Sequence, residues 1–123
     1  EALPKQNPIF TEKTIRRIFQ ALRIEVNNEL NEIIDSLNSI KKSIKSKGVI
    51  ICISYHSLED KIVKQFFKEI TTHCICEPIV PICKCDIEQQ FSYPRKKKYF
   101  PSDKEKESNP RSNSAIMRYV VKL

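Results

Sequence analysis

Glycine is nearly absent from this chain of 123 residues, which contains only Gly48. Loops that cradle a phosphate or a dinucleotide need several glycines, because side chains would keep the backbone N–H groups away from the phosphate oxygens. We therefore expect no cofactor-phosphate loop within this sequence.

Long apolar segments are missing as well. No run approaches the roughly 20 residues that a membrane-spanning helix requires, and the N-terminal stretch lacks the pattern of a signal peptide. The sequence begins at Glu1 rather than at methionine, as a fragment or a processed product would. We expect a cytoplasmic protein without membrane contact, consisting of one domain or a piece of one.

Positive charge is in excess. The chain has 22 lysines and arginines against 15 aspartates and glutamates, which gives a formal net charge of +7. Such an excess favours a polyanionic partner such as RNA. A lysine-rich proteome without any such partner would produce the same balance, so charge alone leaves both interpretations open.

Four of the five cysteines form a cluster with the spacing C-x-C-x6-C-x-C. Zinc prefers four thiolates, but its usual cysteine pairs are separated by two to four residues. A surface loop or a loop disulfide therefore remains open beside a zinc site, and we predict no metal. The candidate ligands are Cys74, Cys76, Cys83 and Cys85, with His73 as a further candidate. The fifth, Cys52, is expected in an inert core position.

Apolar residues spaced three and four apart predict helix over about thirty residues, from 15 to 44. An extended lead-in over residues 1–10 precedes it, with Thr11 as the N-cap. The Asn27-Asn28 pair is the expected break between two helices. Gly48 is the expected C-cap at the end of the second.

The apolar run over residues 49–53 predicts a strand buried on both faces. A helix is expected over residues 58–70, a short strand over 90–94 and a terminal strand over 114–123. The charged stretch 103–108 is interpreted as a solvated loop. One strand–helix unit with two late strands is too little for a complete α/β sheet, so we expect further chain before Glu1 to belong to the same fold.

The turn that leaves the buried strand carries an unusual variety of polar groups. In open α/β sheets ligands bind at the carboxyl ends of the strands, so we interpret this turn as part of a functional site. Capping of the following helix is the alternative interpretation. The residues concerned are Ser54, Tyr55, His56, Ser57, Glu59 and Asp60.

Three segments together resemble a known family. They are IFQALRIEVNNEL (18–30), GVIICISYHSLEDKIVKQFF (48–67) and PSDKEKESNPRSNSAIMR (101–118), and CICEPIVPICKC resembles a further segment of many members. Their order and spacing are similar to the MraW-type enzymes, which are S-adenosylmethionine-dependent methyltransferases that methylate N4 of a cytosine in small-subunit (16S) ribosomal RNA. The resemblance covers about residues 13–121.

The resemblance implies an α/β fold, namely the C-terminal part of a Rossmann-like methyltransferase core with an inserted helical domain. Residues 1–45 would be the end of the helical insert and the return helix. Residues 46–123 would be the last strands of the core, with a Cys/Pro loop at 73–86. The family's S-adenosyl-L-methionine motifs lie upstream and match nothing here, so we expect no cofactor-binding residue in this chain and no activity of the chain alone.

The resemblance also implies residue roles. The turn residues Ser54, His56, Ser57, Glu59 and Asp60 would line the catalytic cleft for the cytosine. Basic residues would contact 16S ribosomal RNA in the small ribosomal subunit: Arg16, Arg17, Arg23, Arg95, Lys96, Lys97, Lys98 and Arg111. The chain departs from the family pattern at residues 13–16 and at Asn113, where the family has His-Pro-Ala-Thr and arginine.

The basic residues leave three hypotheses about the function of the chain open, of which the methyltransferase is the first. The run Arg95–Lys98, flanked by aromatic side chains, suits RNA, but a solvated face would look the same. A non-catalytic basic RNA-binding module with a zinc knuckle is the second function hypothesis. A structural or interaction fragment whose charge is only compositional is the third.

Overall fold

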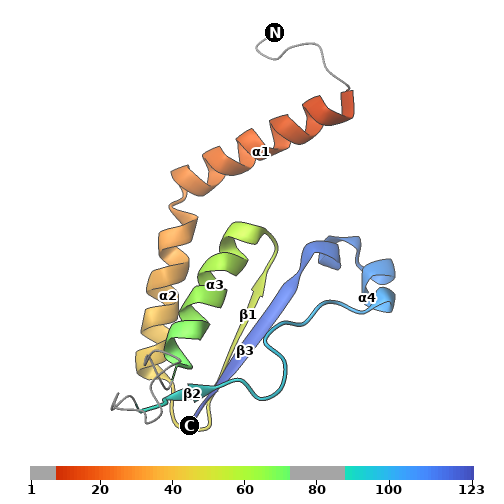
Figure 1. Cartoon of the computed structure of the whole chain (residues 1–123). Helices are drawn as coiled ribbons and strands as arrows, with labels where there is room; N and C mark the ends of the chain where they lie inside the picture. The colour runs from red at the N-terminus through yellow and green to blue at the C-terminus, as the bar shows by residue number, and fades with distance from the viewer. Residues whose placement is uncertain (1–7, 73–87) are drawn as a thin grey trace, which may run out of the picture. The chain divides into compact units, whose positions relative to one another are not determined.

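The computed structural model describes residues 8–72 and 88–123 (Figure 1). The chain divides into two compact units, Glu1–Glu32 and Ile33–Leu123, which are described separately. The four clustered cysteines, Cys74, Cys76, Cys83 and Cys85, and His73 lie outside the described residues. Within the described ranges, no helix combines the length and the apolar character needed to cross a bilayer.

The first unit contains helix α1 (Pro8–Val26) and the beginning of helix α2 (Glu29–Ser43). The predicted N-cap, Thr11, lies inside α1, so that prediction was wrong. The helix begins at Pro8 instead, because the fixed φ of proline suits the first helical turn and its missing N–H is not needed there.

The predicted break at Asn27-Asn28 is confirmed. Asn28 has a φ of 53°, in the left-handed region that asparagine tolerates better than most residues. Its carbonyl accepts the N–H of Asn31 at 3.1 Å, and its side-chain oxygen accepts from the Asn31 amide at 2.6 Å. One residue thus ends α1 and starts the hydrogen bonding of α2.

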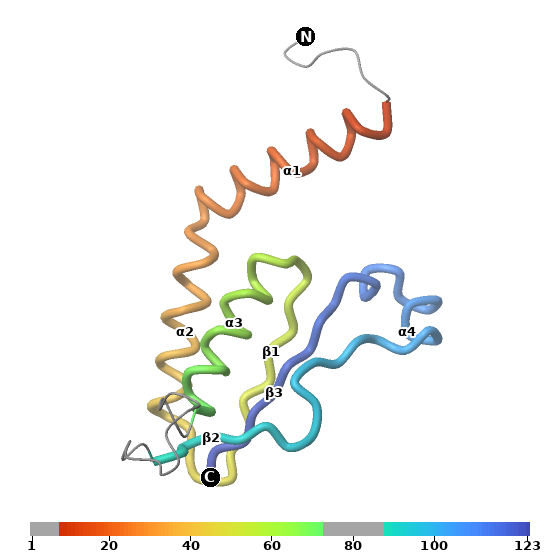
Figure 2. The backbone as a smooth tube through the Cα atoms, viewed as in Figure 1, coloured from red at the N-terminus to blue at the C-terminus, as the bar shows by residue number. Residues whose placement is uncertain are grey.

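The second unit is built on a three-stranded antiparallel sheet. Its order is β1 (Val49–Ser54), β3 (Ile116–Lys122), β2 (Phe91–Ser92), so the last strand along the chain lies in the middle. Figure 2 shows β1 and β3 running side by side, and Val49 pairs with Val121 at one end of their register. The backbone of Tyr99 also pairs with Met117 of β3.

Helix α3 (Ser57–Ile70) packs on one face of this sheet, where the core lies. Its amphipathic pattern directs Val63, Phe67 and Ile70 inward. Phe67, Phe91 and Val120 are completely enclosed. Among the described residues, the buried members of this core are Leu37, Ile50, Val63, Phe67, Ile70, Phe91 and Val120.

Strand β1 is buried on one face only, so the prediction of two buried faces was wrong for the described residues. Ile50 and Ser54 face the core, whereas Val49, Ile51 and Ile53 are 48, 60 and 56% exposed. The reason is that α3 covers one side and no described element covers the other. Cys52 lies half-buried on the core side, and burial raises the pKa of its thiol, in keeping with an unreactive cysteine.

Gly48 does not cap a helix, contrary to the prediction. Helix α2 ends at Ser43, and the residue in the left-handed region is Lys47, with a φ of 64°. Gly48 is needed for a close approach instead. A Cβ atom at this position would collide with the side chain of Ile44 and lie 2.8 Å from the carbonyl oxygen of Lys45.

We therefore expect Gly48→Ala to destabilise the full-length protein by about 1–3 kcal/mol, since the Lys45 backbone must shift to admit the methyl group. Urea unfolding measures the effect. Lys47→Gly is the matched control, because glycine relieves the strained φ there and should leave stability unchanged or slightly higher. Equal stability of Gly48→Ala and the unaltered protein would contradict this packing.

The C-terminal segment differs in part from its prediction. Residues 103–108, expected as a loop, form helix α4 (Asp103–Ser108). The Ser102 hydroxyl accepts the N–H of Glu105 at 3.2 Å, and two acids lie in the first turn, so the local sequence caps its own helix. A 3-10 helix, η1 (Pro110–Ser114), follows, and the terminal strand begins at Ile116 rather than Ser114. The short strand predicted over 90–94 is present as β2 but covers only Phe91–Ser92.

Candidate functional site

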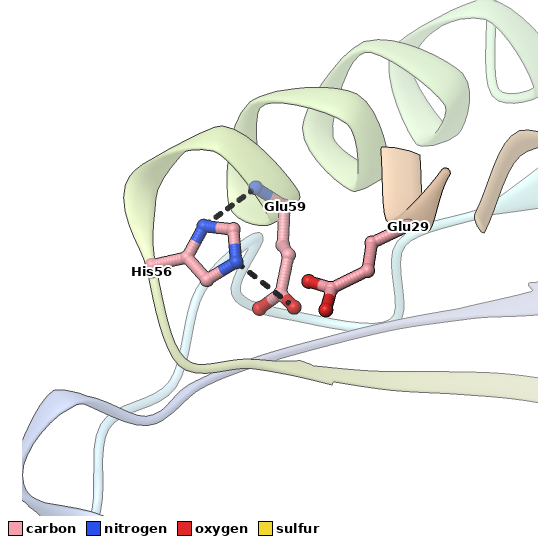
Figure 3. Close-up of side chains that lie close together, drawn as sticks. All are labelled: Glu29, His56 and Glu59. Carbon is pink, nitrogen blue, oxygen red and sulfur yellow. Dashed lines mark hydrogen bonds and ion pairs between the residues drawn. The ribbon is translucent and has the colours of Figure 1, made fainter. Parts of the chain in front are cut away.

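His56 and Glu59 lie together at the start of α3, where both side chains accept backbone N–H groups (Figure 3). His56 is the N-cap, and its Nδ1 accepts the N–H of Glu59 at 3.4 Å. Oε2 of Glu59 accepts the N–H of Tyr55 at 2.9 Å. The N–H of Glu59 in the first turn of α3 and the N–H of Tyr55, one residue before the N-cap, are thereby satisfied. The capping interpretation of His56 and Glu59 is thus confirmed, with His56 as the N-cap.

Capping through Nδ1 leaves the other imidazole nitrogen of His56, Nε2, beside the Glu59 carboxylate (Figure 3). Because Nδ1 accepts a hydrogen bond, the neutral ring carries its hydrogen on Nε2. Nε2 lies 3.1 Å from Oε1 of Glu59 but makes no hydrogen bond within the described part of the chain, although it is buried. Glu29, also drawn in Figure 3, belongs to the first unit and is not part of this pair. A carboxylate beside an imidazole N–H can accept a proton from a ligand.

Asp60 is committed to a different partner. Arg118, 6% exposed on β3, donates from Nε to Oδ1 at 2.7 Å and from Nη2 to Oδ2 at 2.9 Å. Arg118 Nη1 also donates to the carbonyl of Lys97 at 2.7 Å. The guanidinium lowers the pKa of the Asp60 carboxyl. Asp60 therefore joins α3, β3 and the Lys97 segment in this structure, and sequence reasoning missed Arg118.

An aromatic groove of about 250 Å³ lies at the end of β1. Tyr55 and Phe100 are largely exposed in it, while Ser112 is buried and its Oγ makes no hydrogen bond to any described residue. The groove brings the strand exit together with the Asn109–Ser112 motif, more than fifty residues later in the chain. Its lining includes Ile53, Tyr55, Tyr99, Phe100, Asn109 and Ser112.

The predicted RNA-binding arginines of the first unit differ in their surroundings. Arg17 is exposed, and Arg16 is exposed but pairs with Glu12 at 2.5 Å. Arg23 donates to both carboxylate oxygens of Glu29, at 2.9 and 3.2 Å. In the second unit, Arg95, Lys96, Lys97, Lys98 and Arg111 are exposed. Their role in RNA binding stays a prediction.

A second groove, here called the lysine groove, has a volume of about 560 Å³. The sequence analysis missed Lys64 and Lys68, which lie one turn apart on α3. The pattern that could have revealed them is a pair of lysines at positions i and i+4 on the polar side of an amphipathic helix. Its lining includes Lys64, Lys68, Tyr93, Lys97, Lys98 and Arg118.

Comparison with known proteins places this chain among methylases. The model of the MraW methylase family matches residues 1–123. Ribosomal RNA small subunit methyltransferase H of Clostridioides difficile (strain 630) is 43% identical over 123 residues, which are 100% of this chain and 40% of that protein. The protein of the same name from Lawsonia intracellularis (strain PHE/MN1-00) is 48% identical over 107 residues, 87% of this chain and 34% of the relative.

The chain belongs to the MraW methylase family, so the resemblance drawn from the sequence motifs is confirmed. It spans about two fifths or less of the length of these relatives.

Proposed function

We propose that this chain is the C-terminal part of an S-adenosylmethionine-dependent methyltransferase that methylates N4 of a cytosine in 16S ribosomal RNA. The relatives' shared name, ribosomal RNA small subunit methyltransferase H, supports the substrate class. The observation that carries the proposal is the meeting of the strand exit and the Asn109–Ser112 motif in one aromatic groove.

The free side of the sheet supports the proposed Rossmann-like core. Within the described residues β1 pairs only with β3, so its other edge is open, and Val49, Ile51 and Ile53 form an apolar exposed face. Native proteins usually pair or cover an open strand edge, and contiguous exposed apolar faces mark contact surfaces. The rest of a methyltransferase core would pair with the open edge and cover this face, with residues 46–123 as its last strands and 1–45 as the end of a helical insert and return helix.

The described residues do not by themselves fit the cofactor. The only glycine, Gly48, packs against Ile44 and does not open a loop that could approach a ligand. We therefore assign S-adenosyl-L-methionine mainly to parts of a full-length protein outside this chain. The residues described here would bind the cytosine that accepts the methyl group.

The aromatic groove offers the chemistry that an unstacked base requires. Bases taken out of an RNA stack are held between aromatic rings and bonded along their edges. Tyr55 and Phe100 supply exposed rings, and the unpaired Oγ of Ser112 supplies a polar group. The Glu59 carboxylate, which lies 3.1 Å from Nε2 of His56, would accept the proton that N4 loses when it is methylated.

The direct test is methyl transfer from radiolabelled S-adenosylmethionine to 16S ribosomal RNA by the full-length protein. Tyr55→Ala is expected to lower transfer about tenfold, since stacking one base contributes about 1–3 kcal/mol. Leu58→Ala is the matched control, because Leu58 is also exposed near the turn but does not line the aromatic groove. No transfer by the unaltered protein would contradict the proposed function.

The cofactor assignment has its own test. Titration calorimetry of S-adenosylmethionine into residues 1–123 alone is expected to show no binding tighter than about 1 mM, whereas the full-length protein binds it. Micromolar affinity of the isolated chain would contradict the assignment.

A non-catalytic RNA-binding module is the second candidate function, and the lysine groove favours it. Tight binding of 16S ribosomal RNA without methyl transfer would support this alternative.

A further inference from the structure

We propose that the lysine groove binds the sugar–phosphate backbone of the RNA strand next to the base held in the aromatic groove. This inference rests on the proposed function and adds Lys64 and Lys68 of α3 to its RNA-binding residues.

Lysines dominate the described lining of the groove. Lys64 and Lys68 project from one helix, and Lys97 and Lys98 come from the segment opposite. Among the described residues, no acidic side chain lines the groove. The nearby Asp60 carboxylate, which Lys64 and Lys98 also attract, is already paired through both oxygens with Arg118. Four lysine ammonium groups therefore face a polyanion without a competing carboxylate in the lining, which is the arrangement that phosphate contacts require.

The groove is also held in shape. Arg118 donates to the carbonyl of Lys97 at 2.7 Å, which fixes the segment that carries Lys97 and Lys98 to β3. The Lys97 ammonium lies 5.4 Å from the centre of the Tyr93 ring. A segment positioned before binding loses less conformational freedom when the ligand arrives.

The position of Lys98 connects the two grooves and favours RNA over an acidic protein. Its ammonium lies 4.6 Å from the centre of the Phe100 ring, and Phe100 lines the aromatic groove. Lys98 itself lines the lysine groove. Cations beside a stacking ring are typical of surfaces that bind bases and backbone of one strand together.

The test uses the full-length protein and whole 16S ribosomal RNA in filter binding over a series of KCl concentrations. Lys64→Gln with Lys68→Gln is expected to weaken binding about tenfold. The slope of log affinity against log salt should fall by roughly 1.5, because two phosphate contacts are lost. The control, Lys42→Gln with Lys45→Gln, removes the same charge from exposed sites outside the groove and should keep the slope.

Equal salt slopes for the two double variants would overturn this inference. In a competition experiment, poly-glutamate is added at the same total charge as the RNA. If poly-glutamate displaces RNA from the unaltered protein but not from the Lys64/Lys68 variant, the groove binds an acidic protein and the inference is overturned. Methyl transfer by the unaltered protein is measured in parallel. If methyl transfer occurs and the two double variants have equal salt slopes, only the role of the lysine groove is refuted. If methyl transfer is absent but the Lys64/Lys68 variant has a reduced salt slope, only the proposed reaction is refuted.

Discussion

Replacing His56 with serine in the full-length protein is expected to lower methyl transfer at least 100-fold while hardly changing its melting temperature. Serine is a good N-cap and can accept the N–H of Glu59 in place of Nδ1, so helix α3 keeps its start. The Nε2–H beside the Glu59 carboxylate disappears, and a misplaced acid–base group can cost about 10²-fold in rate.

Two further variants separate the roles of His56. His56→Ala removes both the cap and the imidazole, so it should lose activity and also about 1 kcal/mol of stability. Lys61→Ala, an exposed position on the same helix, should lose neither. If His56→Ser retains activity within about threefold, a change of under about 1 kcal/mol in the barrier, the residue is only a helix cap.

Replacing Arg118 with methionine is expected to destabilise the second unit by about 3 kcal/mol. The change leaves the Asp60 carboxylate, 14% exposed, without its two guanidinium bonds, and it frees the carbonyl of Lys97. Adding Asp60→Asn to Arg118→Met should recover part of the loss, because the second change removes the unpaired charge. Urea unfolding of Arg118→Met, Asp60→Asn and the double variant measures the coupling free energy between the two side chains. If the losses of stability in the two single variants simply add up in the double variant, the two residues do not interact directly.

The pair also predicts a pH dependence. The pKa of Asp60 is lowered in the folded protein by the Arg118 guanidinium, from an ordinary value of 3.8. A lowered pKa contributes stability that is fully present above the ordinary value and is lost as the pH falls through the folded one. Below pH 3.8 the unaltered protein should therefore lose more stability than Asp60→Asn, and parallel curves would argue against this linkage.

Local sequence patterns predicted the elements well where local forces decide them. The Asn27-Asn28 break and the β1–α3 boundary follow from turn chemistry and periodicity. Helix α4 was missed because a charged composition was given more weight than the Ser102 cap. The role of Gly48 was missed because a close approach to Ile44 depends on the path of the chain, not on the residue type.

The candidate site was predictable only in its parts. The strand exit and the Asn109–Ser112 motif were recognised separately, but the sequence does not show that they share a groove. Arg118 is 58 residues from Asp60, so no local pattern connects them. Lys64 and Lys68 form a groove only because Arg118 holds the Lys97 segment opposite α3.

The central claim is that the aromatic groove presents a cytosine of 16S ribosomal RNA for methylation at N4. The most direct measurement is mass spectrometry of nucleosides from 16S ribosomal RNA treated with the full-length protein and S-adenosylmethionine. The account predicts N4-methylcytidine, which disappears with His56→Ser. A methyl group found only on carbon 5 of cytosine or on another base would contradict it.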